Sequence, residues 1–555
     1  MTSQKVLIIG GVAGGASAAA RARRLSEDAE IIIVERGPHV SFANCGLPYF
    51  VGGEIESRDK LLVQTPESLR ARHNLDVRIN TEAMKIDREQ KRVLLREVKS
   101  GREYWESYDA LVLSPGAAPL KPPIPGIERK GHFVVRTVPD AETISSWVDS
   151  SRTKTAVVVG GGYIGLEMAE QLQRRGLKVS VAEALPQVMA PLDPEMAAWL
   201  HEELRKHSVD LFLGDGVAGF EDPAAGESAK ASVVVLKSGT RLPADLVILG
   251  LGVRAETGLA RDAGLDLGER GGIRVDAAMR TSDPNIYAVG DAVEVRDAVT
   301  GQPAMIPLAG PANRQGRIAA DNIFGRKSTY PGTYGTAVIR IFDLTAACTG
   351  ASEKTLRRAG IAHRAVHLHP GSHAGYYPGA KPIALKLLFS PETRRLLGAQ
   401  AVGEDGVEKR MDVLATALKA GMTVDDIAEL ELCYAPPFGS AKDPVNMAGM
   451  AAQNILDGLV ATIQWDEIAT LDPASHVILD VRDDAERALG HIPNSLHIPL
   501  NELRSRLHEL ARDKEIIVHC QSGQRSYFAS RILMEHGFSV RNLSGSYRTW
   551  RAAVA

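Results

Sequence analysis

The chain has 555 residues, of which 44% are hydrophobic and 24% charged, values that are ordinary for a globular protein. At roughly 150 residues per domain, this length predicts three or four domains. A formal net charge of -3, without a long basic block, argues against nucleic acid or a membrane as the main partner and favours small molecules.

Four cysteines, at positions 45, 348, 433 and 520, are too few for a disulfide framework, and no two have the spacing of a metal site. The first apolar run, VLIIGG, is too short for a signal peptide or a membrane span and predicts a buried first strand. We therefore expect a cytoplasmic protein in a reducing compartment, without a metal centre.

The start of the chain is repeated 150 residues later. VLIIGGVAGGASAA reappears as AVVVGGGYIGLEMA, with Gly10 matching Gly160 and Gly15 matching Gly165. Each copy predicts a strand, a glycine turn and an Ala-rich helix, the beginning of a dinucleotide-binding βαβ unit. Such a turn lets a pyrophosphate approach the backbone N–H groups at the helix N-terminus.

The two glycine turns differ at their middle position. Gly162 completes the fingerprint in the second copy, whereas Val12 replaces the glycine in the first and predicts a less close backbone approach. Three further turn residues are expected to line the cofactors: Ala13, Gly14 and Ile164.

Each copy continues into a second strand that ends in an acid, Glu35 in IIIVERG and Glu183 in VSVAEA. A carboxylate at this place reaches the ribose hydroxyls of a dinucleotide. Glu183 would repel a 2′-phosphate, so the sequence favours NADH over NADPH. The alternative is that Glu183 merely faces solvent.

Two later segments predict a strand that runs into a glycine turn: residues 108–119 (YDALVLSPGAAP) and 281–295 (TSDPNIYAVGDAVEV). With the repeated units, they closely resemble the pyridine nucleotide-disulfide oxidoreductases, flavoproteins with two dinucleotide-binding domains. The resemblance implies FAD in the first unit, with Asp291 on the ribityl chain, and NADH in the inserted second unit. Further cofactor contacts that it implies are Arg36, Ser114 and Gly116.

The pattern changes after residue 325. TAVIRIFD and IALKLLFS predict strands, and VEKRMDVLATALKAG predicts a helix. In the family that this chain resembles, this region is the dimerisation domain, which implies a homodimer. From about residue 466 the chain predicts strands at HVILDVRD, DKEIIVHC and VRNLSGS, and helices at ELRSRLHELA and SYFASRILMEHG.

Cys45, in SFANCGLPY, is the first candidate nucleophile. No second cysteine follows it closely, so an internal disulfide is not expected and its partner sulfur must come from outside. Its place at a turn before a helix predicts N–H groups that stabilise the thiolate and lower the cysteine pKa. The alternative is a buried, inert thiol, and we read Cys348 and Cys433 as such packed thiols.

SFANCGLPY resembles the single-cysteine branch of the family, the coenzyme A-disulfide reductases and NADH-dependent persulfide reductases. The resemblance implies that Tyr376 and Tyr434 flank the attacked sulfur and assist the departing one. It also implies coenzyme A contacts at Ser17, Arg24, Ser41, Asn44 and Lys442. Arg21 and Arg23 are further candidates for binding its phosphates, with a solvated helix face as the alternative.

Cys520, in VHCQSGQRS, is the second candidate nucleophile. An apolar strand runs into a loop from Cys520 to Arg525, where successive N–H groups are expected to surround the sulfur. With Asp480, Arg482 and the segment ERALGHIPNS (486–495), the motif closely resembles a rhodanese domain, which carries sulfane sulfur as a cysteine persulfide. A cysteine phosphatase is the alternative, but it needs five residues between cysteine and arginine, and this loop has four.

The expected fold class is α/β, with two Rossmann-like domains, an α+β dimerisation domain and a rhodanese-like α/β domain. The expected boundaries are 1–113 with 254–325 for FAD, 114–253 for NAD(P)H, 326–455 for dimerisation and 466–555 for the rhodanese-like domain.

The expected activity is an FAD-dependent NADH reductase that acts on coenzyme A persulfide through Cys45, with Cys520 handling sulfane sulfur. Coenzyme A disulfide is the close alternative substrate, and the sequence does not rank either against glutathione persulfide or polysulfide. Competing classes are an NADH oxidase or peroxidase that uses a Cys45 sulfenic acid, a sulfurtransferase with an incidental flavin module, and a redox-sensing interaction protein.

Overall fold

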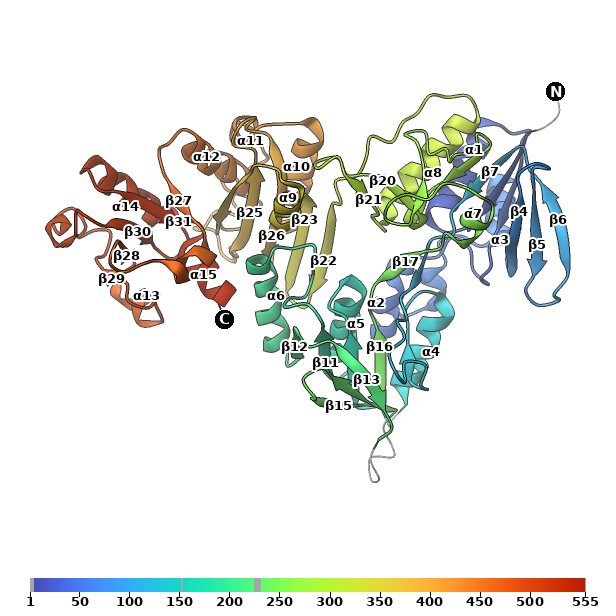
Figure 1. The fold of residues 1–555 in the computed structure, drawn as a ribbon, viewed down its shortest axis with the longest axis horizontal. Helices are drawn as coiled ribbons and strands as arrows, with labels where there is room; N and C mark the ends of the chain where they lie inside the picture. Colours follow the sequence, from blue (N-terminus) through green and yellow to red (C-terminus); the bar gives the residue numbers. More distant parts are fainter. Residues whose placement is uncertain (1–3, 151–152, 224–230, 555) are drawn as a thin grey trace. The chain divides into compact units, whose positions relative to one another are not determined.

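The structure, a computed structural model, describes residues 4–150, 153–223 and 231–554. It forms two compact units, which we describe separately (Figure 1). The first comprises the chain up to Pro186 together with Ser208–Gly335, and the second comprises Gln187–His207 with the chain from Thr336 onward.

The first unit is built around two parallel five-stranded sheets. The first has the order β19-β7-β1-β2-β3. Its inner strands are almost entirely apolar, as expected for a parallel sheet covered on both faces. Its strands are β1 (Lys5–Ile9), β2 (Glu30–Val34), β3 (Asp76–Arg78), β7 (Ala110–Leu113) and β19 (Ile286–Ala288).

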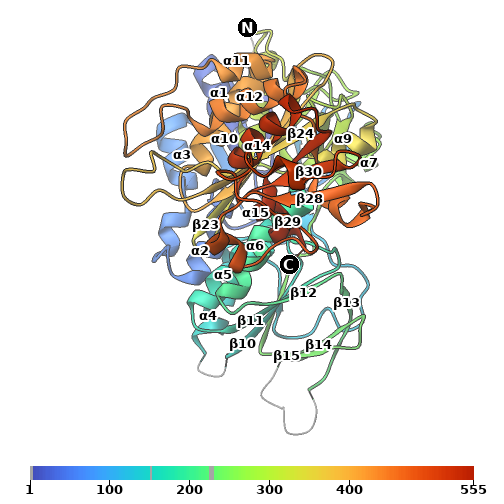
Figure 2. The same cartoon turned by 90° about the vertical axis from the view of Figure 1, so that its left-hand side faces the viewer.

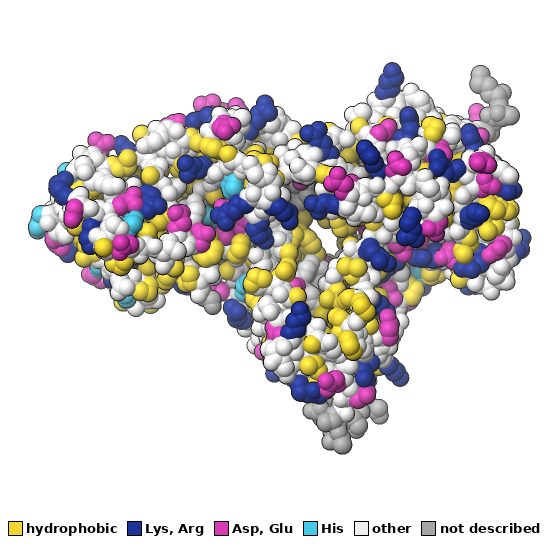
Figure 3. Space-filling model, in the orientation of Figure 1, with side chains coloured by type: hydrophobic (Ala, Val, Ile, Leu, Met, Phe, Trp, Pro, Cys, Tyr) yellow, Lys and Arg dark blue, Asp and Glu magenta, His cyan; other side chains and the backbone are white. Residues whose placement is uncertain are grey.

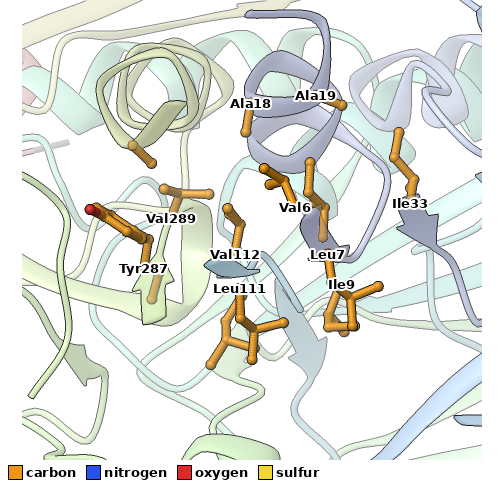
Figure 4. Close-up of a cluster of buried hydrophobic side chains, with 14 of the residues drawn as sticks. Val6, Leu7, Ile9, Ala18, Ala19, Ile33, Leu111, Val112, Tyr287 and Val289 are labelled. Atoms are coloured by element: carbon orange, nitrogen blue, oxygen red, sulfur yellow. The ribbon is translucent and has the colours of Figure 1, made fainter. Parts of the chain in front are cut away.

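Helices α1 (Ala13–Leu25) and α8 (Ala309–Ile323) pack together beside this sheet. Figure 4 shows the resulting core, in which Ala18 and Ala19 of α1 lie near Val6 of β1. The remaining helices of this part are α2 (Leu47–Gly52), α3 (Pro66–His73) and α7 (Gly258–Asp262).

The second sheet of this unit has the order β12-β11-β10-β16-β9, with α5 (Tyr163–Arg174) packed on it (Figure 2). The first βαβ unit and its repeat are therefore confirmed. The strands are β9 (His132–Phe133), β10 (Thr155–Val159), β11 (Lys178–Glu183), β12 (Asp210–Leu213) and β16 (Leu246–Leu249). A further helix is α4 (Val138–Asp149).

Smaller sheets complete the first unit. One comprises β4 (Thr81–Asp87), β5 (Arg92–Glu97) and β6 (Glu103–Ser107), and another β13 (Val217–Glu221), β14 (Ser232–Leu236) and β15 (Arg241–Ala244). The others pair β8 (Ala117–Pro119) with β17 (Val253–Ala255), and join β18 (Ile273–Arg274), β20 (Val293–Arg296) and β21 (Pro303–Ala304).

The second unit contains an antiparallel sheet in the order β22-β23-β26-β25-β24. The strands and the helix predicted between residues 336 and 421 are confirmed. The strands are β22 (Ala337–Ile341), β23 (Leu344–Gly350), β24 (Arg364–Leu368), β25 (Ile383–Phe389) and β26 (Leu396–Gly403). The helices are α6 (Pro194–Lys206), α9 (Glu353–Ala359), α10 (Val407–Ala420), α11 (Val424–Ala428) and α12 (Pro444–Leu456).

The last part of the second unit is a parallel sheet in the order β27-β31-β30-β28-β29, as the βαβ pattern predicted. The strands are β27 (Thr462–Ile463), β28 (His476–Asp480), β29 (Leu496–His497), β30 (Glu515–His519) and β31 (Val540–Leu543). The helices are α13 (Asp484–Ala488), α14 (Gln524–Glu535) and α15 (Ser546–Val554).

One predicted helix is wrong. ELRSRLHELA forms a series of turns with a short 3-10 helix at Leu507–Glu509. Leu503 and Leu510 are nevertheless buried in the core of the domain, so successive turns satisfy the apolar spacing that predicted a helix.

Basic and acidic side chains are interspersed over the face that Figure 3 shows. Within the described residues, no helix combines the length and the apolar character needed to cross a membrane.

Candidate functional site

Both predicted glycine turns require glycine at their first position. Gly10 has φ +93° and Gly160 has φ +108°, in the region that disfavours other residues. A Cβ on Gly10 would lie 2.0 Å from the carbonyl oxygen of Ser114, and one on Gly160 would lie 2.2 Å from that of Gly250. Each turn therefore packs so closely against the neighbouring strand end that a side chain has no room there.

The last glycine of each fingerprint allows the helix to approach the strand. A Cβ on Gly15 would lie 1.9 Å from the carbonyl oxygen of Gly10, and one on Gly165 2.0 Å from that of Gly160. Val12 and Gly162 are the N-cap residues of α1 and α5, neither with a side-chain cap hydrogen bond. The remaining predicted turn residues lie in the first turns of these helices: Ala13, Gly14 and Ile164.

The two strand-end acids have matching environments. Glu35 accepts hydrogen bonds from the N–H groups of Gly11 (2.9 Å) and Gly37 (2.8 Å). Glu183 accepts them from Gly161 (2.7 Å) and Leu185 (2.8 Å). Glu183 is therefore anchored beside its glycine turn, which argues against the alternative of a freely solvated side chain.

The other predicted cofactor residues follow the ends of β2, β7 and β19 in the first unit. The N–H of Ser114 donates to the carbonyl oxygen of Ile9 (2.7 Å), and Gly116 has φ +74°. Asp291 lies in a 3-10 helix, Gly290–Ala292, where burial raises the pKa of its carboxyl group. Arg36 forms an ion pair with Glu256 at 3.2 Å.

Cys45 lies in a 3-10 helix, Asn44–Gly46, directly before α2, and is a free thiol exposed to solvent. Its N–H donates to Asn44 Oδ1 (3.0 Å). The predicted low pKa is wrong for this structure. Desolvation by neighbouring protein atoms, then the negative charges of Glu167 and Asp291, raise the pKa of Cys45 and outweigh its favourable backbone hydrogen bond.

Residues close to Cys45 in sequence form hydrogen bonds with both glycine-turn segments. Tyr49 of α2 donates a hydrogen bond to Glu167 of α5 (3.1 Å), and these helices pack together. Ser41 has φ +47°, and its N–H donates to the carbonyl oxygen of Gly11 (2.8 Å). The thiol therefore lies in the same unit as both predicted dinucleotide sites.

The predicted anion-binding residues of α1 have different environments. Arg24 is exposed, and Ser17 Oγ donates to Asn313 Oδ1 (2.8 Å). Arg21 instead forms an ion pair with Asp321 (2.6 Å). Arg23 is buried and donates to four backbone carbonyl groups, so its predicted phosphate role is wrong: it ties α1 to the end of α3.

Tyr376 and Tyr434 lie in the second unit, with their hydroxyl oxygens 2.6 Å apart. Both side chains are exposed, and the hydrogen bond that Tyr376 shares with Tyr434 raises the pKa of Tyr376. Lys442 is also exposed. Cys433 is exposed rather than packed, which corrects the prediction, whereas Cys348 is half-buried.

Cys520 lies at the end of β30 and is 1% exposed. The N–H of Gly523, the N-cap residue of α14, donates to Cys520 Sγ (3.1 Å). We predicted that several successive N–H groups surround the sulfur. Among the described residues of this loop, the Gly523 N–H is the one that donates to it. The guanidinium group of Arg525 forms an ion pair with Glu486, with N···O distances of 2.6 and 2.7 Å.

Beneath this loop lies a buried ion pair. Asp480 and Arg482 are both at most 1% exposed, and Arg482 Nη2 is 2.8 Å from Asp480 Oδ2. Arg482 Nη1 donates to Gln521 Oε1 (3.2 Å). The motif residues Asp480 and Arg482 therefore support the loop from below.

Sequence reasoning missed Ser546, whose Oγ accepts a hydrogen bond from the Cys520 N–H (3.1 Å) and lies 3.7 Å from Sγ. Ser546 has φ +54°, which is uncommon for a residue other than glycine. The adjoining S-G-S sequence was its only signal.

Comparisons with known proteins agree with this geometry. Residues 4–316 match the family model of the pyridine nucleotide-disulphide oxidoreductases, residues 336–444 match the dimerisation domain of that family, and residues 465–553 match the rhodanese-like domain. The coenzyme A disulfide reductase of Staphylococcus haemolyticus is 34% identical over 453 residues, which cover 81% of this chain and 100% of that protein.

Solved structures are similar over the same regions. Reduced Bacillus anthracis CoADR-RHD is 51% identical with a TM-score of 0.97, covering 100% of this chain and 99% of that one. A NAD-dependent persulfide reductase from A. fulgidus is 41% identical with a TM-score of 0.92, covering 99% and 100%. Water-forming NADH oxidase from Lactobacillus brevis, bound to NADH, is 29% identical with a TM-score of 0.78, covering 82% and 100%.

The predicted α/β fold class is thereby confirmed, and because the first family model alone spans more than half of the residues, this chain belongs to the pyridine nucleotide-disulphide oxidoreductase family and carries a rhodanese-like domain after its dimerisation domain.

Proposed function

We propose that this chain is an FAD-dependent NADH reductase of persulfides, with coenzyme A persulfide as its substrate. The observation that carries the proposal is the pairing of an exposed free thiol at a turn before a helix, Cys45, with a domain that contains a second thiol, Cys520. A free thiol without a neighbouring cysteine must exchange with sulfur from outside.

The glycine turns fit the two dinucleotides. The glycine turns lead directly into the N-termini of α1 and α5, where a pyrophosphate would bind, and Glu35 and Glu183 lie beside these turns for ribose hydroxyls. We assign FAD to the first turn, with Asp291, Arg36, Ser114 and Gly116, and NADH to the second. When bound, these cofactors supply the electron pair that reduces a Cys45 disulfide.

The reaction at Cys45 balances as two steps. The Cys45 thiolate attacks the inner sulfur of coenzyme A persulfide, a Cys45–coenzyme A disulfide forms, and hydrosulfide leaves. Two electrons and one proton then cleave this disulfide, which releases coenzyme A and restores the thiolate. Burial and the carboxylates of Glu167 and Asp291 raise the pKa of Cys45 and so disfavour the attacking thiolate.

The coenzyme A contacts and the tyrosines come from different units. We propose that Ser17, Arg24, Ser41 and Asn44 bind coenzyme A from the first unit. In a homodimer, Tyr376, Tyr434 and Lys442 would reach the partner's site, where the tyrosine pair donates a proton to the departing sulfur. The exposure of both hydroxyls supports this role.

Cys520 would carry sulfane sulfur as a persulfide, with Arg525 contributing positive charge at the loop. The domain boundaries given above, the homodimer and the cytoplasmic location are part of this proposal. The four domains would then divide the work between electron entry, thiol exchange, assembly and sulfur delivery.

Coenzyme A disulfide is the second candidate substrate, since relatives named coenzyme A disulfide reductase are about a third identical over most of this chain. An NADH oxidase or peroxidase is a candidate from another class, because one such oxidase shares the fold. The similarity to that oxidase covers 82% of this chain, and an oxidase activity would not explain the presence of the Cys520 domain.

The test measures NADH consumption and sulfide release with coenzyme A persulfide, coenzyme A disulfide, peroxide and oxygen. Cys45→Ser is expected to abolish reduction of both coenzyme A compounds, whereas Cys520→Ser affects only longer sulfur donors. Cys348→Ala serves as the thiol control and should match the wild type. Fastest turnover with peroxide or oxygen would overturn the proposal.

A further inference from the structure

A buried lysine gathers three carboxylates within the second unit. Lys386 on β25 is 1% exposed, and its Nζ lies 2.6 Å from Glu195, 2.6 Å from Glu353 and 2.9 Å from Asp193. Burial alone would lower the pKa of Lys386, but the three carboxylates outweigh it and raise that pKa. Separating Glu195 from Lys386 would leave a buried charge without its partner, which is strongly unfavourable. Glu195 is therefore fixed in position.

His367 on β24 connects this cluster with the rhodanese-like domain. Its Nε2 lies 3.0 Å from Glu195 Oε1. On the other side of the ring, Nδ1 lies 3.2 Å from Ser544 Oγ, which also accepts a hydrogen bond from the His367 backbone N–H at 2.9 Å. His367 and Ser544 are both buried. A single serine hydroxyl is thus fixed by two groups of one histidine.

Gly545 shows how closely the two segments pack. A Cβ at this position would lie 2.8 Å from His367 Cβ and 2.0 Å from Thr549 Oγ1. Gly545 has φ +69° and Ser546 has φ +54°, so two successive residues adopt the left-handed conformation. For Ser546 this conformation is costly and persists only where surrounding contacts impose it.

Ser546 is the residue that touches the second nucleophile. Its Oγ accepts a hydrogen bond from the Cys520 N–H at 3.1 Å, lies 3.7 Å from Cys520 Sγ, and is 3.1 Å from Ser526 Oγ. One glycine separates this serine from Ser544. The contact of Ser544 with His367 therefore sets the start of the turn that delivers Ser546 to the sulfur.

We propose that His367 is a positioning residue for the Cys520 sulfur site, because through Ser544 it holds the Ser546 hydroxyl against Cys520. The inference rests on the proposed sulfur transfer at Cys520. His367 does not contact the sulfur itself. Glu195 of the Lys386 cluster contacts the far side of the His367 ring.

The experiment uses the full-length protein with thiosulfate as donor and cyanide as acceptor. The Cys520 thiolate takes the outer sulfur of thiosulfate and releases sulfite, and cyanide then removes that sulfur as thiocyanate. Ser544→Ala is expected to lower kcat about tenfold with little change in the KM for thiosulfate. It should slow alkylation of Cys520 by iodoacetamide at a fixed pH by a similar factor, followed by mass spectrometry.

Three further variants separate positioning from general support. The side-chain amide of His367→Asn can replace the contact of Nδ1 with Ser544 Oγ but not the contact of Nε2 with Glu195. This variant should therefore keep most of the activity that His367→Ala loses. Arg551→Ala removes an exposed ion pair with Glu202 (3.2 Å), which also joins α15 to α6, and should match the wild type. Thermal unfolding identifies any variant that is misfolded.

Unchanged Cys520 alkylation in both Ser544→Ala and His367→Ala would overturn the inference, as would an equal loss in Arg551→Ala. The alkylation arm is independent of the proposed function. If the wild type transferred no sulfur, the role of Cys520 in sulfur transfer would fail, while alkylation would still decide whether His367 positions the site.

Discussion

Glu183 accepts a hydrogen bond from the N–H of Gly161 at 2.7 Å, at the junction between the second glycine turn and its neighbouring strand. Glu35 accepts the equivalent bond from Gly11 at 2.9 Å in the first turn. The internal repeat therefore extends from sequence to hydrogen bonding, and it fixes a negative charge beside each proposed ribose site.

This charge leads to a prediction about nucleotide choice. Glu183→Ala should lower the ratio of kcat/KM for NADH to that for NADPH about tenfold, because it removes both a ribose acceptor and a charge that repels a 2′-phosphate. Steady-state kinetics with both nucleotides provide the measurement. Glu221→Ala, which removes an exposed carboxylate paired with Arg241, is the control. An unchanged ratio would show that Glu183 does not select the nucleotide.

A second prediction concerns the carboxylate near Cys45. Desolvation raises the pKa of Cys45 most, and Glu167 adds to it, so Glu167→Gln should lower that pKa and increase the thiolate fraction at neutral pH. We expect Cys45 alkylation to become a few-fold faster, the scale of one charge near a surface thiol. The pH dependence of alkylation checks this.

Tyr49→Phe is the matched control for that experiment, because it removes the hydrogen bond to Glu167 but keeps the charge. It should leave the alkylation midpoint close to that of the wild type. Equal effects of the two variants would assign the shift to local packing rather than to the carboxylate.

Much of this fold could be predicted because its signals are local. Strand, glycine turn and helix occupy one short stretch, and each glycine is required by backbone crowding within its own unit, as at Gly10 and Gly15. The same holds for Cys45 and Cys520, which both lie at the predicted turns.

The errors concern residues whose partners are distant in sequence. Arg23 resembles a phosphate ligand until the carbonyl groups of His73 and Asn74 come to it from the end of α3. The pKa of Cys45 depends on Glu167, from the second glycine unit. No sequence motif marks His367, because its partners, Glu195 of α6 and Ser544, are distant from it in sequence.

The tyrosine pair supports a third prediction. Since Tyr376 and Tyr434 share a 2.6 Å hydrogen bond, they should act as one unit in protonating the departing sulfur. Tyr376→Phe and Tyr434→Phe are each expected to lower kcat about a hundredfold, and the double variant should lose little more. Single-turnover kinetics with coenzyme A disulfide measure the loss. Tyr377→Phe removes a neighbouring exposed hydroxyl and should be neutral, whereas additive losses in the pair would contradict a shared role.

A fourth prediction follows from His519, which lies fully buried beside the Asp480–Arg482 pair. Burial lowers the pKa of His519 to about 4, despite the opposing attraction of Asp480. Between pH 6.5 and 4 the unfolded chain therefore binds a proton at this histidine that the folded chain does not. Stability is complete above pH 6.5 and falls as the pH drops through this window, by on the order of 3 kcal/mol for this group.

The measurement is the midpoint of urea unfolding followed by circular dichroism, determined from pH 7 down to pH 4.5. The midpoint should fall with pH in the wild type, and the fall should be shallower in His519→Gln. His201 and His369, whose pKa values burial lowers to about 4 and about 3, contribute to the remaining slope in the second unit. His508→Gln is the control because this histidine is exposed, and an identical slope in all three proteins would rule out His519 as the titrating group.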